Sequence, residues 1–233
     1  MKQKKNENIT KKESFFVEHT VDTLTKTIEI KETEKKPNFC TLKKIHLKAA
    51  KAEFFEVRKI VSDMLDKASK SLPKGYQFML FETYRSEEKQ ISLWNIELEK
   101  NKQKYPEKNK EELDEITNLV IANPYKVGSG HQTGGAIDIT LCYNGYPIDM
   151  GSKYLETDNP KTKTDSEGLT PEQKKNRELL VSTLAKVGLV NYPLEWWHFS
   201  YGEHEWAVLT NQKSTLFAKT KRKLFKNECF VHE

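Results

Sequence analysis

The stretch SGHQTGGAIDITL, Ser129–Leu141, is the part of the sequence that decides the fold. Its second half alternates between small or polar residues and large apolar ones, which predicts a strand with Asp138 on one face and the isoleucines beside it on the other. The Gly134-Gly135 pair allows a sharp backbone turn that can bring His131 to the side of Asp138. The stretch therefore predicts a constrained turn that feeds a strand, with two polar side chains at the join.

The sequence around this strand mixes helices and strands. Asn144-Gly145 directly follows it and predicts a hairpin that returns antiparallel through Tyr146–Met150. Two further strands are expected, at Tyr76–Tyr84 and within Asn191–Gly202. Apolar spacing and capping residues predict helices through Leu47–Leu65, after Ser86, over Glu111–Ile121, and from Thr170-Pro171 to Gly188. We expect an α+β fold: a single compact domain with a central, mainly antiparallel sheet flanked by helices, with the polar join before the strand as a candidate site at the sheet.

Composition divides the 233 residues into three parts. Residues 1–37 are rich in Lys, Glu and Thr, and we expect a polar extension that is poorly ordered or forms an edge element. Residues 38–218 hold the apolar patterns and form the predicted globular domain. Residues 219–233 form a basic C-terminal tail.

Charge and hydrophobicity exclude several classes of protein. The net charge of +5 is mild and mostly terminal, so we expect no nucleic-acid partner. No apolar run approaches the roughly 20 residues that a membrane helix needs, and the basic N-terminus is not followed by the apolar core of a signal peptide. The three cysteines are far apart in the sequence and form no CxxC motif, which favours a reducing compartment. A cytoplasmic protein without a membrane span is the expectation, and the oligomeric state is not predicted.

Two segments supply candidate metal ligands. His131 and Asp138 are reasonable zinc ligands, although such a pair is also commonly a hydrogen-bonded structural couple. In LEWWHF, His198 would complete a His2Asp set and leave a fourth position for water. Glu195 could take a proton from that water if it lies in a bend before the strand, which Pro193 favours. The alternative is a core strand whose histidine bonds to the backbone.

Arg85 is the third candidate. It follows a strand and precedes a helix, so its guanidinium is held firmly and could bind a substrate carboxylate or stabilise an oxyanion. The alternative is an ion pair with Glu82 or Glu88.

These residues resemble a known family. The pattern SxHxxGxAxD at Ser129–Asp138, followed by the EWWH of Glu195–His198 and preceded by Arg85, is similar to the signature of VanX-type D-alanyl-D-alanine dipeptidases. VanY-type D,D-carboxypeptidases belong to the same wider group of zinc D,D-peptidases. The resemblance implies a compact α+β domain and one Zn²⁺ per chain.

The resemblance also implies roles for individual residues. His131, Asp138 and His198 would hold zinc, Glu195 would be the catalytic base, and Arg85 would stabilise the transition state. Ser129 would contact the substrate.

One segment departs from the family pattern. Family members carry MGxxFD, whereas this chain reads MGSKYLETDNP, with Leu155 where an acidic residue is expected and Glu156 as its nearest substitute. That acidic group would hold the free amino end of the substrate, so Glu156 is a candidate substrate-binding residue.

The expected reaction is zinc-dependent hydrolysis of D-Ala-D-Ala or a similar short D-amino-acid dipeptide. The alternatives are a D,D-carboxypeptidase or endopeptidase that acts on cell-wall peptides and, third, a catalytically inactive zinc or binding module.

Overall fold

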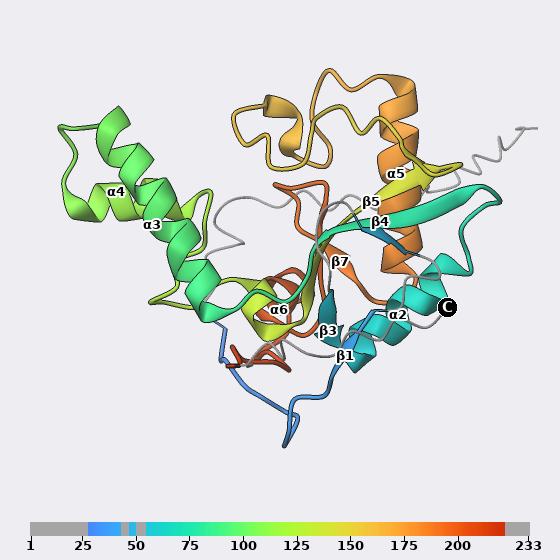
Figure 1. Ribbon diagram of the computed structural model, residues 1–233, viewed down its shortest axis with the longest axis horizontal. Coiled ribbons are helices and arrows are strands. Elements are labelled where there is room, and N and C mark those ends of the chain that lie inside the picture. The colour runs from blue at the N-terminus through green and yellow to red at the C-terminus, as the bar shows by residue number, and fades with distance from the viewer. Residues whose placement is uncertain (1–27, 43–46, 50–54, 222–233) are drawn as a thin grey trace, which may run out of the picture.

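A six-stranded sheet forms the centre of the computed structural model, which describes residues 28–42, 47–49 and 55–221 (Figure 1). The strand order is β2-β4-β5-β8-β7, and β6 pairs with the far end of β5. Only β2 and β4 are parallel among these pairs, so the sheet is mainly antiparallel as predicted. The strands are β2 Leu47–Ala49, β4 Tyr76–Glu82, β5 Ala136–Tyr143, β6 Tyr146–Pro147, β7 Val190–Asn191 and β8 His198–Ser200.

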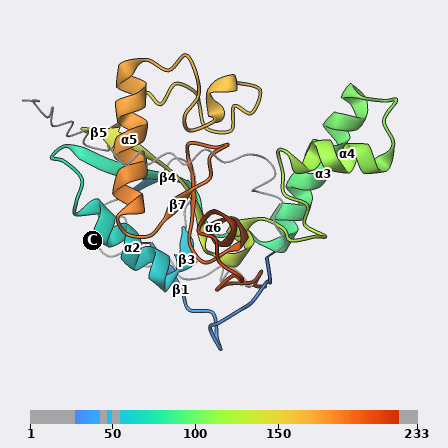
Figure 2. The same ribbon diagram turned by 180° about the vertical axis from the view of Figure 1, so that it is seen from behind.

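Helices lie at two ends of this sheet. α2 (Lys59–Ser69) and α5 (Pro171–Ala185) pack against each other, while α3 (Glu87–Lys104) and α4 (Lys110–Asn118) form a separate pair at the opposite end (Figures 1 and 2). The short helix α6 (His204–Leu209) follows β8. The predicted α+β class is confirmed. No helix in the described residues is long and apolar enough to cross a membrane.

One face of β5 belongs to the main core. Ile137, Ile139 and Leu141 are fully buried in a cluster that includes Leu65 of α2 and Leu180 of α5. The alternation of β5 therefore leaves the other face, which carries Asp138, for the polar site. The predicted hairpin is also present, because Asn144 and Gly145 both have positive φ, at 47° and 86°, as a type I′ turn requires.

The helix predicted through 47–65 is wrong at 47–49 and 56–58, and residues 50–54 lie outside the described residues. Residues 47–49 form β2, Glu56–Arg58 form β3, and the helix begins only at Lys59. β3 pairs with β1 (Phe39–Thr41), with Cys40 opposite Val57. Phe55 and Val57 are both buried, and apolar residues two positions apart are typical of a strand. Apolar residues three or four positions apart are typical of a helix, so the sequence pattern allows either element. Pairing of β3 with β1 selects the strand.

The strand expected within Asn191–Gly202 is interrupted. Only its two ends are strands, β7 and β8, and the residues between them form a loop. Tyr192 directly follows β7, and its backbone N–H donates to the carbonyl of His198 in β8 at 2.9 Å. This hydrogen bond keeps the start of the loop attached to the sheet.

Residues 28–34 lie against the C-terminal part of the chain. Glu29 pairs with Ser214 in an isolated parallel bridge, and the fully buried Arg58 binds carboxylates of this segment. Its guanidinium lies 2.5 Å from Glu32 Oε2 and 2.9 Å from Glu34 Oε2, and it donates to the carbonyl of Thr133 at 2.7 Å. Arg58 thus joins the N-terminal segment to the turn before β5. Residues 1–27 and 222–233, which make up most of the two predicted extensions, lie outside the described residues.

α5 begins at the capping box that the sequence predicts. The hydroxyl of Thr170 accepts the N–H of Gln173 at 3.2 Å, and the Gln173 side chain accepts the N–H of Thr170 at 2.9 Å.

We expect Thr170→Ala to lower the free energy of unfolding by about 1 kcal/mol, because the Thr170 hydroxyl accepts a backbone N–H of the first turn that has no acceptor within the helix. Urea denaturation measures the change. Thr170→Ser keeps the hydroxyl and should retain most of the stability; an equal loss in both variants would contradict the capping role.

Candidate metal centre

The site is built on one row of residues across three strands. Glu82 of β4 and His198 of β8 lie directly opposite Asp138 of β5, one on each side. The register of β4 shifts between Leu80 and Glu82, which is the mark of a bulge. On a regular strand Leu80 and Glu82 would share a face, and the bulge instead turns Glu82 to the face of Asp138.

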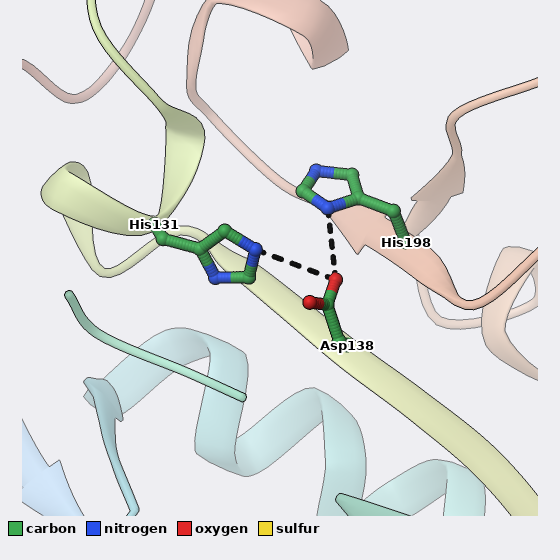
Figure 3. Close-up of side chains that lie close together, drawn as sticks. All are labelled: His131, Asp138 and His198. Carbon is green, nitrogen blue, oxygen red and sulfur yellow. Dashed lines mark hydrogen bonds and ion pairs between the residues drawn. The ribbon is translucent and has the colours of Figure 1, made fainter. Parts of the chain in front are cut away.

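Three side chains converge on this face (Figure 3). One atom from each of His131, Asp138 and His198 lies within 4.8 Å of the others, and all three residues are buried. Asp138 Oδ1 is 3.3 Å from His131 Nε2 and 3.0 Å from His198 Nδ1. The structure therefore brings together the three predicted metal ligands from one turn and two strands.

The turn before β5 places His131. The residues Gly130–Thr133 form a 3₁₀ turn that Ser129 and Gln132 cap reciprocally, and Gly134 follows at a φ of 75°. A Cβ on Gly134 would lie 2.3 Å from the Phe39 ring, so the turn needs glycine there for space as well as for φ. The ring Nδ1 lies 2.8 Å from the carbonyl of Thr83. Because a carbonyl can only accept, Nδ1 carries a proton, and Nε2 is the ring nitrogen that faces Asp138.

His198 is held from the opposite side. Its Nε2 lies 3.0 Å from Oε2 of Glu205 on α6, while its Nδ1 faces Asp138. Burial disfavours the charged imidazole, yet the carboxylates of Glu205 and Asp138 raise the pKa of His198 well above its ordinary value. A carboxylate behind a ligating histidine is the usual device that fixes which ring nitrogen faces a metal.

The donor set fits zinc. Two imidazoles and one carboxylate, all buried, are the ligand types that catalytic zinc sites combine with an open fourth position. To bind a metal, His131 Nε2 must be free of a proton, and its lone pair then repels the nearby Asp138 oxygen unless a cation lies between them. A bound cation would remove this repulsion and the cost of burying the carboxylate.

Glu195 lies beside this cluster in the loop between β7 and β8. The N–H of His198 donates to the carbonyl of Glu195 at 3.2 Å, which closes a tight turn and replaces the alternation of a strand. The sequence required such a bend for both residues to serve one site. Burial raises the pKa of Glu195 to about 7, with His198 opposing the shift and the carboxylates of Asp138 and Glu205 adding to it. A pKa near neutrality suits a carboxylate that accepts and returns a proton.

Arg85 is buried just after β4, where it forms the ion pair with Glu82 that the sequence left open. Its guanidinium lies 2.5 Å from Glu82 Oε2 and donates to Gln90 Oε1 at 2.7 Å. Its backbone N–H donates to the carbonyl of His131 at 3.1 Å. The ion pair holds Arg85 in place beside the predicted metal ligands, so pairing with Glu82 is compatible with a role toward substrate.

Ser129 and Glu156 are placed differently. The hydroxyl of Ser129 accepts the N–H of His131 at 3.3 Å, so it supports the ligand turn directly. The carboxylate of Glu156 accepts hydrogen bonds from the N–H of Lys153 and the side chain of Asn159, both in its own loop. The structure does not bring Glu156 into the cluster. Substrate contacts of both residues stay predictions.

Sequence reasoning missed the groups that hold the predicted ligands in place. Glu205 supports His198, the carbonyl of Thr83 supports His131, and the hydroxyl of Tyr154 donates to Asp138 Oδ2 at 2.9 Å. Burial and the carboxylates of Asp138 and Glu82 raise the pKa of Tyr154, so the phenol keeps its proton. In the sequence, the tyrosine at 154 and the acidic residue at 205 are the signals of these supporting contacts. A contact through a backbone carbonyl, as at Thr83, leaves no signal in the sequence.

A buried His2Asp cluster with a carboxylate base beside it is typical of zinc hydrolases. Comparison with known families is more specific. The model of the D-ala-D-ala dipeptidase family matches residues 39–220, and the chain belongs to this family. The match covers the sheet and every site residue described above.

Individual relatives agree with this membership. Three proteins named D-alanyl-D-alanine dipeptidase are similar to the chain: from Synechocystis sp., 36% identical over 95 residues; from Escherichia coli, 29% over 126; and from Enterococcus faecium, 29% over 158. The aligned segments cover 36%, 54% and 62% of this chain. They span 38% and 55% of the first two relatives, less than two thirds of each, and 75% of the third.

Solved structures show a weaker likeness. A vancomycin-resistance D,D-pentapeptidase VanY variant in complex with Zn(II) is 16% identical with a TM-score of 0.43, over 83% of this chain and 96% of that chain. VanYB in complex with D-alanine-D-alanine is 14% identical with a TM-score of 0.42, over 81% and 86%. Both scores are too low to assign a fold.

Replacement of a ligand tests the metal site directly. We expect His131→Gln to abolish stable zinc binding, because only two protein ligands would remain and catalytic zinc sites use three. Metal analysis after dialysis measures the zinc retained. His204→Gln is the matched control, since His204 lies outside the cluster on α6. Equal zinc contents in the two variants would exclude His131 as a ligand.

Proposed function

We propose that this protein is a zinc-dependent dipeptidase that hydrolyses the peptide bond of D-Ala-D-Ala or of a similar short D-amino-acid dipeptide. The observation that carries the proposal is the buried cluster of His131, Asp138 and His198 with Glu195 beside it. Membership of the D-ala-D-ala dipeptidase family and three relatives of that name support the substrate class.

The three ligands would hold one Zn²⁺ per chain. When bound, zinc supplies a Lewis acid that polarises a carbonyl and makes water more acidic. Glu195 accepts the proton of the attacking water at its carboxylate and returns it to the leaving amine. Its raised pKa, about 7, suits both halves of this transfer.

Arg85 stabilises the negative charge that develops on the carbonyl oxygen. The guanidinium is already oriented by Glu82 and Gln90, so little reorganisation is needed when that charge appears. The low exposure of the site strengthens this interaction relative to water. A cytoplasmic location, where small dipeptides are available, stays part of the proposal.

Removal of the base should separate chemistry from metal binding. We expect Glu195→Gln to lower kcat by about 10²- to 10⁴-fold, the usual contribution of a general base, while bound zinc is retained. Release of D-Ala from D-Ala-D-Ala and metal analysis of the same sample measure the two effects. Glu178→Gln, on the exposed face of α5, is the control and should leave both unchanged. Normal turnover in Glu195→Gln would show that another group is the base.

The choice of substrate distinguishes a dipeptidase from a carboxypeptidase. Incubation with D-Ala-D-Ala, with L-Ala-L-Ala and with a peptidoglycan pentapeptide that ends in D-Ala-D-Ala, followed by measurement of released alanine, gives the comparison. We expect turnover of D-Ala-D-Ala, with at least about tenfold higher kcat/KM than for the pentapeptide, equivalent to roughly 1.4 kcal/mol. The reverse order would identify a D,D-carboxypeptidase, and no release from any of the three by zinc-loaded protein would identify an inactive module.

A further inference from the structure

The two oxygens of Asp138 have different neighbours. Oδ1 faces both histidines, at 3.3 Å and 3.0 Å, whereas Oδ2 accepts a hydrogen bond from the Tyr154 hydroxyl at 2.9 Å. A carboxylate can rotate and offer a metal one oxygen or two. The phenol opposes that rotation, because it occupies Oδ2 while Oδ1 points to the ligand cluster.

The ring of Tyr154 is itself held on two sides. It stacks on Phe81 with ring centres 4.2 Å apart and an interplanar angle of 7°, and it meets the edge of Trp197 at 5.6 Å. Phe81 is the residue at the β4 bulge, between Leu80 and Glu82. The bulge therefore serves the site twice, since it presents Glu82 to Asp138 and supplies the surface on which Tyr154 rests.

Tyr154 also belongs to the loop that follows Met150. Its neighbour Leu155 has a φ of 59° and is 54% exposed, and beyond it Glu156 bonds only within the loop. Among the described residues of 151–159, Tyr154 makes the hydrogen bond to a metal ligand. The position of this loop and the orientation of Asp138 are thus joined through one hydroxyl.

We infer that Tyr154 is a positioning residue of the metal centre, whose hydroxyl holds Asp138 so that Oδ1 alone faces the metal and thereby links zinc affinity to the loop 151–159. The inference rests on the proposed function, because it takes the cluster as a zinc site. Groups that hydrogen-bond to ligating carboxylates orient them, and their loss typically costs about 10- to 100-fold in metal affinity. A purely structural role for Tyr154 would reside in its ring packing, which phenylalanine preserves.

The variant Tyr154→Phe removes the hydroxyl and keeps the ring. We expect the dissociation constant for zinc, measured by competition with a chromophoric chelator, to rise by about 10- to 100-fold. The matched control is Tyr84→Phe, because the half-buried Tyr84 donates its hydroxyl to the carbonyl of Thr220 at 2.8 Å and not to a metal ligand. Its zinc affinity should equal that of the unmodified protein. A Tyr154→Phe affinity within about threefold of the unmodified protein, or an equal loss in both variants, would overturn the inference.

A second measurement reports the link to the loop. If zinc and the loop are coupled, zinc should slow trypsin cleavage after Lys153 in the unmodified protein and slow it much less in Tyr154→Phe, because coupling between two sites is reciprocal. Equal protection by zinc in both proteins would remove the loop from the inference.

Zinc affinity is measured without substrate, so the two proposals can fail separately. A protein that binds zinc and loses affinity on Tyr154→Phe, yet does not release D-Ala from D-Ala-D-Ala, would overturn the proposed substrate and leave the role of Tyr154 in place. Turnover of D-Ala-D-Ala with unchanged zinc affinity in Tyr154→Phe would do the opposite.

Discussion

The pairing of Asp138 with His198 across β5 and β8 is the constraint on which the site depends. It places a carboxylate and an imidazole opposite one another, with Oδ1 and Nδ1 3.0 Å apart. A slip of one residue in this register would send Asp138 into the apolar core and bring Ile137 or Ile139 to the site. The fully buried isoleucines therefore do more than fill the core, since their burial fixes the face on which Asp138 stands.

Charge around this pair is balanced over short distances. Glu82 and Arg85 form a largely buried ion pair next to the predicted ligands, and Glu205 lies behind His198. Burial opposes the ionisation of Glu82, but His131, Arg85 and Lys89 together lower its pKa to about 2. Glu195 has no such cationic partner at hydrogen-bonding distance among the described residues, and its pKa rises to about 7. Two carboxylates of one site thus have different proton affinities because their neighbours differ.

The sequence predicted what local chemistry determines. The glycine pair before β5, the Asn144-Gly145 hairpin, and the capping box at Thr170 all appear where the residue pattern placed them. The three predicted metal ligands fall in two short segments, and the structure brings their side chains together. The helix predicted through 47–65 was wrong at 47–49 and 56–58, since β2 and β3 form by pairing with other strands of the chain. The bulge in β4 and the partners Tyr154 and Glu205 also depend on contacts between distant segments, which no single stretch of sequence encodes.

Arg58 shows how far the site extends beyond its ligands. Its fully buried guanidinium binds the carbonyl of Thr133 beside the ligand turn and is neutralised by Glu32 and Glu34. A chain shortened to the residues that match the family would keep the arginine and lose both carboxylates. Of these partners, the guanidinium would then retain only the carbonyl of Thr133. The acidic residues upstream of the family match therefore belong to the structure that holds the turn before β5.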